Sequence, residues 1–269
     1  MLEQLNLSGL NRIEVAIKRM QMFEPPDGYY LAFSGGKDSI VVKALADMAG
    51  VKYDAHYNHT SVDPPELIYF IREYHPDVII EYPRYPDGER ITMWNLIPKK
   101  KMPPTRLVRY CCQYLKEAGG ERRFTITGVR WAESNKRRSR SGLELSDGTK
   151  KGKRIGADPD NPDNEELARY CPTRGKHILN PIIDWEDEDI WEFINRYNIP
   201  YCKLYDYGYK RLGCIGCPFS SNASKEFSDY PRFEKLYKKA FERMLEERKK
   251  AGMPTEWNSP EDVIEWWIR

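Results

Sequence analysis

The spacing of apolar residues along the chain switches between two periods, which predicts alternating helices and strands. An opening helix over residues 2–22 is predicted from apolar side chains at helical spacing: Leu2, Leu5, Leu10, Ile13, Ile17 and Met20. Short apolar or alternating runs predict strands at 28–33, 51–58, 77–82, 123–130 and 177–183. Start and stop residues predict further helices at 39–50, 64–75, 106–120 and 186–198.

This order of elements predicts an α/β fold with a doubly wound, mostly parallel sheet. We expect an N-terminal helix at 1–25, an α/β domain at 26–203 and a helical, cysteine-bearing C-terminal appendage at 204–269. Within the appendage, a helix over 230–252 has an apolar stripe that predicts core packing. Its members are Phe233, Leu236, Tyr237, Ala240, Met244 and Leu245.

The composition is that of an ordinary globular protein. The chain has 269 residues, of which 40% are hydrophobic and 31% charged. It has no apolar run of about 18 residues, the length that would span a bilayer. The N-terminus does not have the pattern of a signal peptide, so we expect a cytoplasmic protein. A net charge of +2 gives no global argument for nucleic-acid binding.

Charge is less even locally. Residues 136–154 are strongly basic, and the acidic run 157–166 follows directly. One interpretation is a solvated, mobile loop whose ends attract each other. The other is a basic lid over a polyanionic ligand. The sequence favours neither.

A glycine-rich turn lies between the strand at 28–33 and the following helix. Its six residues are Ser34, Gly35, Gly36, Lys37, Asp38 and Ser39. Glycines let successive backbone N–H groups converge on an anion, and the helix N-terminus adds its dipole. The hydroxyl groups and the Lys37 ammonium are further donors. The spacing differs from that of the nucleoside-triphosphate P-loop.

Four of the six cysteines form two pairs, and their spacing predicts a metal site. Cys111 and Cys112 are adjacent, whereas Cys214 and Cys217 form a C-x-x-C motif. Zinc accepts four thiolates, but adjacent cysteines suit one tetrahedral ion poorly. A 4Fe-4S cluster has several corners to accept them. A third interpretation makes Cys111 and Cys112 buried helix thiols.

The turn resembles the PP-loop of the adenine nucleotide alpha-hydrolase superfamily, whose members bind the pyrophosphate of ATP. The cysteine pattern resembles that of the assimilatory sulfonucleotide reductases, which act on adenylyl sulfate or phosphoadenylyl sulfate. The stretch TITGVRWAESNKRRSR is similar to the arginine loop of these reductases. The block from LNPIID to GCIGCPF, residues 179–219, is similar to theirs almost residue for residue. The resemblance covers residues 28–220.

The resemblance implies a homodimeric oxidoreductase of sulfate assimilation with a PP-loop nucleotide-binding domain. It implies a 4Fe-4S cluster on Cys111, Cys112, Cys214 and Cys217, beside the bound sulfonucleotide. Lys37 and arginines would hold the phosphosulfate. A cysteine would attack the sulfate sulfur, and thioredoxin or another thiol donor would release sulfite. The other product would be AMP or adenosine 3′,5′-bisphosphate.

The chain departs from this family at the nucleophile. The reductases have a cysteine near their C-terminus, but this chain has none after Cys217. Cys171 and Cys202 remain outside the expected cluster. Cys171 lies among basic residues that would stabilise a thiolate, so it is the better candidate for the catalytic cysteine.

The complete PP-loop motif keeps two other functions open. Many sulfonucleotide reductases have a degraded motif, so an intact one favours an ATP-dependent enzyme that thiolates tRNA or DNA. In that case Lys99, Lys100 and Lys101 and the basic segment 136–154 would contact the nucleic-acid backbone. The missing terminal cysteine instead favours a non-catalytic nucleotide-binding sensor.

Other polar residues are candidates for substrate binding. His59 and Asp63 follow the second strand, where ribose or adenine contacts are expected. Guanidinium groups bind phosphate or sulfate oxygens in a bidentate way. The arginines expected to bind the substrate are Arg130, Arg137, Arg138 and Arg140, with Arg130 also expected to be catalytic.

Overall fold

A computed structural model of the chain describes residues 2–6, 8–117, 119–146, 154–165, 176–220 and 222–268. The chain forms two compact units, each built of three segments. The first unit comprises Met1–Tyr57, Tyr69–Ile80 and Gly119–Arg211. The second comprises Asn58–Ile68, Glu81–Ala118 and Leu212–Arg269. The second unit therefore joins the C-terminal tail to two segments that the sequence analysis assigned to the α/β domain.

Seven strands of the described residues form one sheet, in the order β3-β2-β1-β4-β7-β5-β6. The strands are β1 (Tyr29–Ala32), β2 (Tyr53–Asn58), β3 (Ile79–Glu81), β4 (Thr125–Ile126), β5 (Leu143–Ser146), β6 (Arg154–Ala157) and β7 (Ile178–Leu179). β1 runs parallel to β2 and β4, and β4 runs parallel to β7. β5 runs antiparallel to both β7 and β6. Since parallel strands end at the same edge, the turns that follow β1, β4 and β7 meet there.

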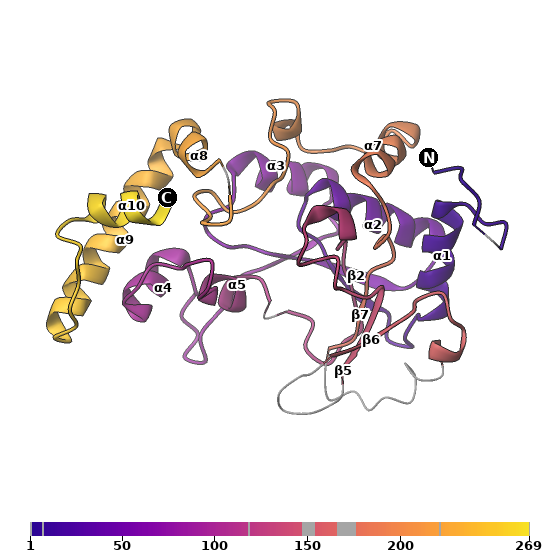
Figure 1. Ribbon diagram of the computed structural model, residues 1–269, viewed down its shortest axis with the longest axis horizontal. Helices are drawn as coiled ribbons and strands as arrows, with labels where there is room; N and C mark the ends of the chain where they lie inside the picture. Colours follow the sequence, from indigo (N-terminus) through magenta and orange to yellow (C-terminus); the bar gives the residue numbers. More distant parts are fainter. Residues whose placement is uncertain are drawn as a thin grey trace. The chain divides into compact units, whose positions relative to one another are not determined.

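Helices lie before, between and after these strands in the chain (Figure 1). They are α1 (Arg12–Met22), α2 (Lys37–Ala49), α3 (Pro65–Tyr74) and α7 (Asp187–Arg196), with the short 3-10 turns η1 (Trp131–Glu133) and η2 (Lys203–Tyr205). α2 connects β1 to β2 and α3 lies between β2 and β3, whereas α1 precedes β1 and α7 follows β7. α1 and α7 each pack against α2. The predicted mostly parallel α/β fold with a helical C-terminal part is confirmed.

The first helix is shorter than predicted. α1 begins at Arg12 because the Asn11 side chain accepts hydrogen bonds from the N–H groups of Ile13 and Glu14. The Glu14 carboxylate in turn accepts the N–H of Asn11, which completes a capping box. Leu2 is fully buried although it lies outside the helix. Leu2 is therefore apolar because it packs in the core, and its spacing from the later apolar residues matched that of a helix by coincidence.

The basic segment 136–154 contains part of a hairpin that the sequence analysis did not predict. β5 and β6 pair in antiparallel register, with Leu143 opposite Ala157. Leu143, Glu144 and Leu145 are all buried, and β5 lies between β7 and β6, so it is an interior strand of the sheet. The charged Glu144 and the surrounding lysines and arginines concealed this short strand in the sequence.

The second unit is built around the helices of the C-terminal part. They are α4 (Met93–Lys100), α5 (Tyr110–Leu115), α8 (Ala223–Asp229), α9 (Pro231–Lys250) and α10 (Pro260–Ile268). α9 packs against α4, α8 and α10. The predicted stripe of α9 supplies core residues, among which Tyr237, Ala240 and Met244 are fully buried.

Two helices of this unit differ from prediction. α5 spans only six residues of the predicted helix 106–120, because a turn in which Val108 N donates to Thr105 Oγ1 precedes it. α4 was not predicted, since it contains Pro98. Its start is fixed by a Thr92–Asn95 capping box. None of the helices that the structure describes has the length and apolar composition needed to cross a membrane.

Candidate functional site

The glycine turn connects the end of β1 to the start of α2. Gly35 has a φ of 71°, in the left-handed region that favours glycine. Gly36 is the N-cap of α2, and no side chain caps the helix there. Among described residues, the N–H groups of Gly35 and Asp38 have no hydrogen-bond acceptor. A helix N-terminus with unbonded N–H groups at the carboxyl edge of a parallel sheet is suited to an anion.

The two serines hold the turn in shape. The Ser39 hydroxyl donates to the carbonyl of Gly36 at 2.9 Å and accepts the N–H of Ser34 at 3.2 Å. The hydroxyl oxygens of Ser34 and Ser39 are also 3.2 Å apart. These bonds close the turn on itself, so the hydroxyl groups stabilise its conformation.

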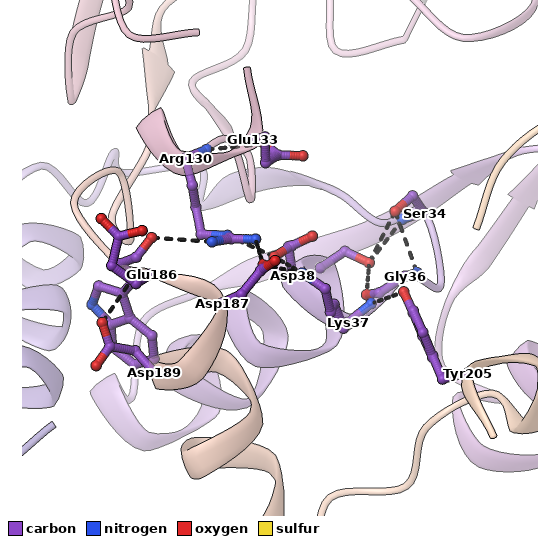
Figure 2. Close-up of polar contacts among 12 residues, drawn as sticks. Ser34, Gly36, Lys37, Asp38, Arg130, Glu133, Glu186, Asp187, Asp189 and Tyr205 are labelled. Atoms are coloured by element: carbon purple, nitrogen blue, oxygen red, sulfur yellow. Dashed lines mark hydrogen bonds and ion pairs between the residues drawn. The ribbon is translucent and has the colours of Figure 1, made fainter. Parts of the chain in front are cut away.

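Two cations and two carboxylates lie next to the turn (Figure 2). Lys37 Nζ lies 2.8 Å from Asp187 Oδ1 and 3.3 Å from Asp38 Oδ1. Arg130 Nε lies 2.7 Å from Asp38 Oδ1, and Arg130 Nη2 lies 2.6 Å from Asp187 Oδ1. Lys37 and Arg130 are buried, so each of the two cations needs a carboxylate partner to offset the cost of burying its charge.

Arg130 lies at the turn, but its guanidinium group already donates hydrogen bonds to oxygen atoms of the protein. Besides its two carboxylate partners, its Nη1 donates to the carbonyl of Trp185 at 3.1 Å. Its backbone N–H donates to the carboxylate of Glu133, the last residue of η1. Each guanidinium nitrogen therefore already has an oxygen partner. In this arrangement Arg130 positions the turn, and direct contact with a substrate stays a prediction.

Tyr205 and Asp187 belong to the site, although the sequence analysis did not select them. The hydroxyl of Tyr205 accepts the N–H of Lys37 at 2.8 Å (Figure 2). Burial raises the pKa of Tyr205, so the hydroxyl is protonated at neutral pH. Both residues lie in the block from 179 to 219 that carried the family resemblance. That resemblance was the available signal for them.

Further arginines lie near this network. Burial and the nearby charge of Arg211 lower the pKa of Arg137 to about 10, and Arg140 acts in the same direction. Arg137 forms an ion pair with Glu133, and Arg140 forms one with Glu144. The guanidinium groups of Arg137, Arg140 and Arg211 therefore lie near enough to interact, and such neighbouring cations can bind one anion.

The remaining predicted substrate ligands are placed differently. Arg138 is exposed. His59 and Asp63 belong to the second unit, the one that carries the four paired cysteines. Asp63 accepts the N–H and the hydroxyl of Thr60, both at 2.7 Å, which forms a local turn. His59 Nδ1 lies 3.1 Å from Arg90 Nη2.

The four paired cysteines all lie in the second unit. Cys111 and Cys112 are on α5, and Cys214 and Cys217 are on the loop before α8. A hydrogen bond to Cys112 raises the pKa of Cys111, and burial and the charges of all three other sulfurs raise it further. This mutual influence shows that the four sulfurs are gathered. Among described residues, no three potential ligands converge on one point as a single ion would require.

Two cations accompany these sulfurs. Arg109 Nη2 lies 3.3 Å from the sulfur of Cys112. The hydrogen bond from Cys111 and the contact with Arg109 lower the pKa of Cys112 to about 5. The charge of Cys214 raises the pKa of Lys116. Four sulfurs with two cations suit an anionic metal–thiolate group, because the cations offset its charge. The sequence analysis did not select Arg109 or Lys116.

The helices after the C-x-x-C motif hold its loop in place. Gly216, with a φ of 69°, donates its N–H to the Glu226 carboxylate at 2.7 Å. A Cβ at this position would lie 2.4 Å from the Phe227 ring. The Tyr237 hydroxyl donates to the carbonyl of Ile215 at 3.0 Å. The conformation of the motif thus depends on α8 and α9.

Cys202 and Cys171 belong to neither of the two cysteine pairs in the sequence. Cys202 is buried immediately before η2, with 1% of its surface exposed. Cys171, the predicted nucleophile, lies outside the described residues. Its role stays a prediction.

Comparison with known proteins places the chain among relatives of varied description. An uncharacterised protein of Methanocaldococcus jannaschii is 26% identical over 239 residues, which cover 82% of this chain and 47% of that protein. The chain therefore spans about half the length of this relative. An adenosine 5′-phosphosulfate reductase of Neisseria meningitidis is 42% identical over 51 residues, or 19% of this chain and 21% of the relative.

A solved structure of phosphoadenylyl-sulfate reductase from Candida auris, in complex with phosphate, matches with 18% identity and a TM-score of 0.47. The match covers 78% of this chain and 90% of that one. The family model of the phosphoadenosine phosphosulfate reductase domain matches residues 28–220, which include the glycine turn and all four paired cysteines. The predicted resemblance is confirmed, and the chain belongs to the phosphoadenosine phosphosulfate reductase domain family.

Proposed function

We propose that the chain reduces an adenine sulfonucleotide, either adenylyl sulfate or phosphoadenylyl sulfate, to sulfite. The observation that carries the proposal is the combination of an anion site at the glycine turn with four gathered cysteines, within a chain of this family. The neighbouring cations Arg137, Arg140 and Arg211 support a substrate with phosphate and sulfate groups. The unbonded N–H groups of Gly35 and Asp38 support a phosphate contact at the turn.

The proposed reaction has two steps, each of which is an attack by a thiol. A cysteine thiolate attacks the sulfate sulfur, the bond from this sulfur to the phosphate oxygen breaks, and the nucleoside phosphate leaves. A second thiol then attacks the modified cysteine, sulfite leaves with the electron pair, and the two thiols become a disulfide. Cys171 is the proposed nucleophile, and a dithiol protein of the thioredoxin type is the proposed reductant. We also propose a homodimer.

The four gathered cysteines fit a 4Fe-4S cluster, and we propose that they hold one. Two adjacent thiols on a helix and two on a loop can bind different corners of a cluster, whereas one tetrahedral ion would accept them poorly. Cys111, Cys112, Cys214 and Cys217 would be the ligands. The cluster, when bound, would help to polarise the sulfate. Lys116 would orient the sulfate beside the cysteines.

Sulfite formation tests the proposal. Protein purified without oxygen is incubated with each sulfonucleotide and a dithiol, and sulfite is measured. The expected result is sulfite from one or both substrates, and loss of this activity in the Cys171→Ser variant. Retained activity in that variant would remove Cys171 as the nucleophile. Absence of sulfite from both substrates, with iron and sulfide present, would reject the proposed reaction.

ATP-dependent thiolation of nucleic acid is a second candidate, favoured by the cations of the second unit. Arg90 lies over the ring of Tyr82 at 4.2 Å, and Lys99 lies over that of Tyr85 at 3.5 Å. Residues 81–118 contain eight Lys and Arg against four Asp and Glu. Such cations, held over aromatic rings in the unit that also carries the cysteines, would suit a phosphate backbone. Release of AMP and pyrophosphate from ATP only when tRNA or DNA is present would favour this function.

A further inference from the structure

A carboxylate of the protein itself occupies the cationic part of the anion site. Oδ1 of Asp187 lies 2.8 Å from Lys37 Nζ and 2.6 Å from Arg130 Nη2. Asp187 is the first residue of α7, so its carboxylate also lies at a helix N-terminus. Figure 2 shows it between the two cations. A single acceptor shared by two buried cations is the arrangement expected for a bound anion.

The charges of these four side chains cancel. Lys37 and Arg130 contribute two positive charges, and Asp38 and Asp187 contribute two negative charges. As long as both carboxylates remain, the ammonium and guanidinium groups offer no net positive charge to a phosphate. An incoming polyanion gains full attraction only when one carboxylate leaves.

The two carboxylates differ in how easily they can move. The Asp38 side chain is 23% exposed and accepts from Arg130 Nε. The backbone of Asp38 is tightly packed, since a Cβ at Gly128 would lie 3.0 Å from the Asp38 carbonyl carbon. The Asp187 side chain is 63% exposed. It can therefore rotate into water without burying its charge, whereas Asp38 is held in place.

We propose that Asp187 is a displaceable anion that holds Lys37 and gives it up when the phosphate group of a ligand binds. Lys37 transfers from the carboxylate to the phosphate, while Arg130 keeps Asp38 and the Trp185 carbonyl. The Lys37–Asp187 contact thereby lowers the affinity of the site for every ligand, because each ligand must replace this contact. This inference rests on the proposed anion site but not on sulfite formation.

Inorganic pyrophosphate is the probe, and calorimetric titration of the full chain measures its affinity. Asp187→Asn leaves Lys37 without its nearer carboxylate, so pyrophosphate should bind about tenfold more tightly than to the unmodified chain. Glu188→Gln is the matched control. Glu188 is the next residue of α7 and is exposed, so its affinity should stay at that of the unmodified chain. Lys37→Ala should abolish the gain when combined with Asp187→Asn.

Thermal unfolding gives a second measurement that separates this role from a purely structural one. Without pyrophosphate, Asp187→Asn should melt below the unmodified chain, because a buried ammonium has lost a partner. With pyrophosphate, the melting temperature should rise more in the variant than in the unmodified chain. Asp187→Ser should behave in the same way.

Two results would overturn the inference. Equal or weaker pyrophosphate binding by both folded Asp187 variants would show that the carboxylate is not displaced. No binding by the unmodified chain would reject the anion site and with it this inference, while sulfite formation would still decide the proposed function. Binding to the unmodified chain without a change in the variants would leave the proposed function intact and reject only the role of Asp187.

Discussion

Arg130 Nε and Asp38 Oδ1 lie 2.7 Å apart, although 92 positions separate the two residues in the chain. The contact joins the loop after β4 to the first turn of α2. Because Arg130 is 1% exposed, its charge depends on this carboxylate and on Asp187. The relationship makes Arg130 a fixed part of the anion site.

Arg130→Ala should therefore destabilise the first unit. The substitution removes a buried cation and leaves Asp38 and Asp187 without it, and we expect a loss of about 3 kcal/mol in the free energy of unfolding. Urea denaturation measures this loss. Arg138→Ala is the control, since Arg138 lies in the same region but is exposed, and it should change stability by less than about 0.5 kcal/mol. Equal losses of stability in the two variants would show that the buried ion pairs of Arg130 do not stabilise the first unit.

Gly216→Ala tests how tightly the C-x-x-C loop is held. Its positive φ should cost about 1 kcal/mol, and the contact with Phe227 should add about 1–3 kcal/mol. Gly252→Ala is a matched control, because Gly252 has a φ of 64° with open space around it. We expect reduced iron and sulfide content in the first variant and normal content in the second. Full metal content in Gly216→Ala would contradict a role of this loop in binding the cluster.

Lys116→Gln should slow sulfite formation with little effect on iron content. Its ammonium lies close enough to Cys214 for that sulfur to raise its pKa, so it is positioned to stabilise negative charge there. We expect kcat/KM to fall by about 100-fold, the loss typical of removing one electrostatic contact in an active site. Lys249→Gln, an exposed change at the end of α9, should leave kcat/KM unchanged. A normal rate in Lys116→Gln would exclude this role.

The pair of Asp54 and Arg123 predicts a pH dependence of stability. The hydrogen bonds from Arg123 lower the pKa of Asp54 below 3.8. A lowered folded-state pKa stabilises the protein above the unfolded value, and this contribution is lost as pH falls through the folded value. Arg123→Gln should thus reduce stability at pH 7 but much less below the pKa of Asp54. Urea midpoints at several pH values test this, with Arg122→Gln, an exposed neighbour, as the control. A constant difference across pH would contradict the expectation.

The local parts of the site were predictable from sequence, whereas its long-range partners were not. A strand, a glycine turn and a helix follow one another directly, so their pattern predicted β1, the turn and α2. Asp187 reaches Lys37 across 150 positions, and Tyr205 reaches it across 168. Only the pairing of β1, β4 and β7 brings such residues together, and no local pattern records it.

Charge and proline concealed other elements. Lysines and arginines around β5 and β6 concealed a short hairpin, and Pro98 concealed α4. The adjacent cysteines were recognisable as candidate ligands by their spacing. Arg109 and Lys116 were not, because a cation near a sulfur resembles any exposed basic residue until the fold is known.

The contacts that α8 and α9 make with the C-x-x-C loop have a consequence for protein engineering. Glu226, Phe227 and Tyr237 all follow residue 220, where the match to the family domain ends. A graft of residues 28–220 into another scaffold would carry the cysteines without the supports that shape their loop. Conversely, exchanging the segment after residue 220 between relatives would change the supports of the C-x-x-C loop. Every residue of the glycine turn and its charged partners would stay the same.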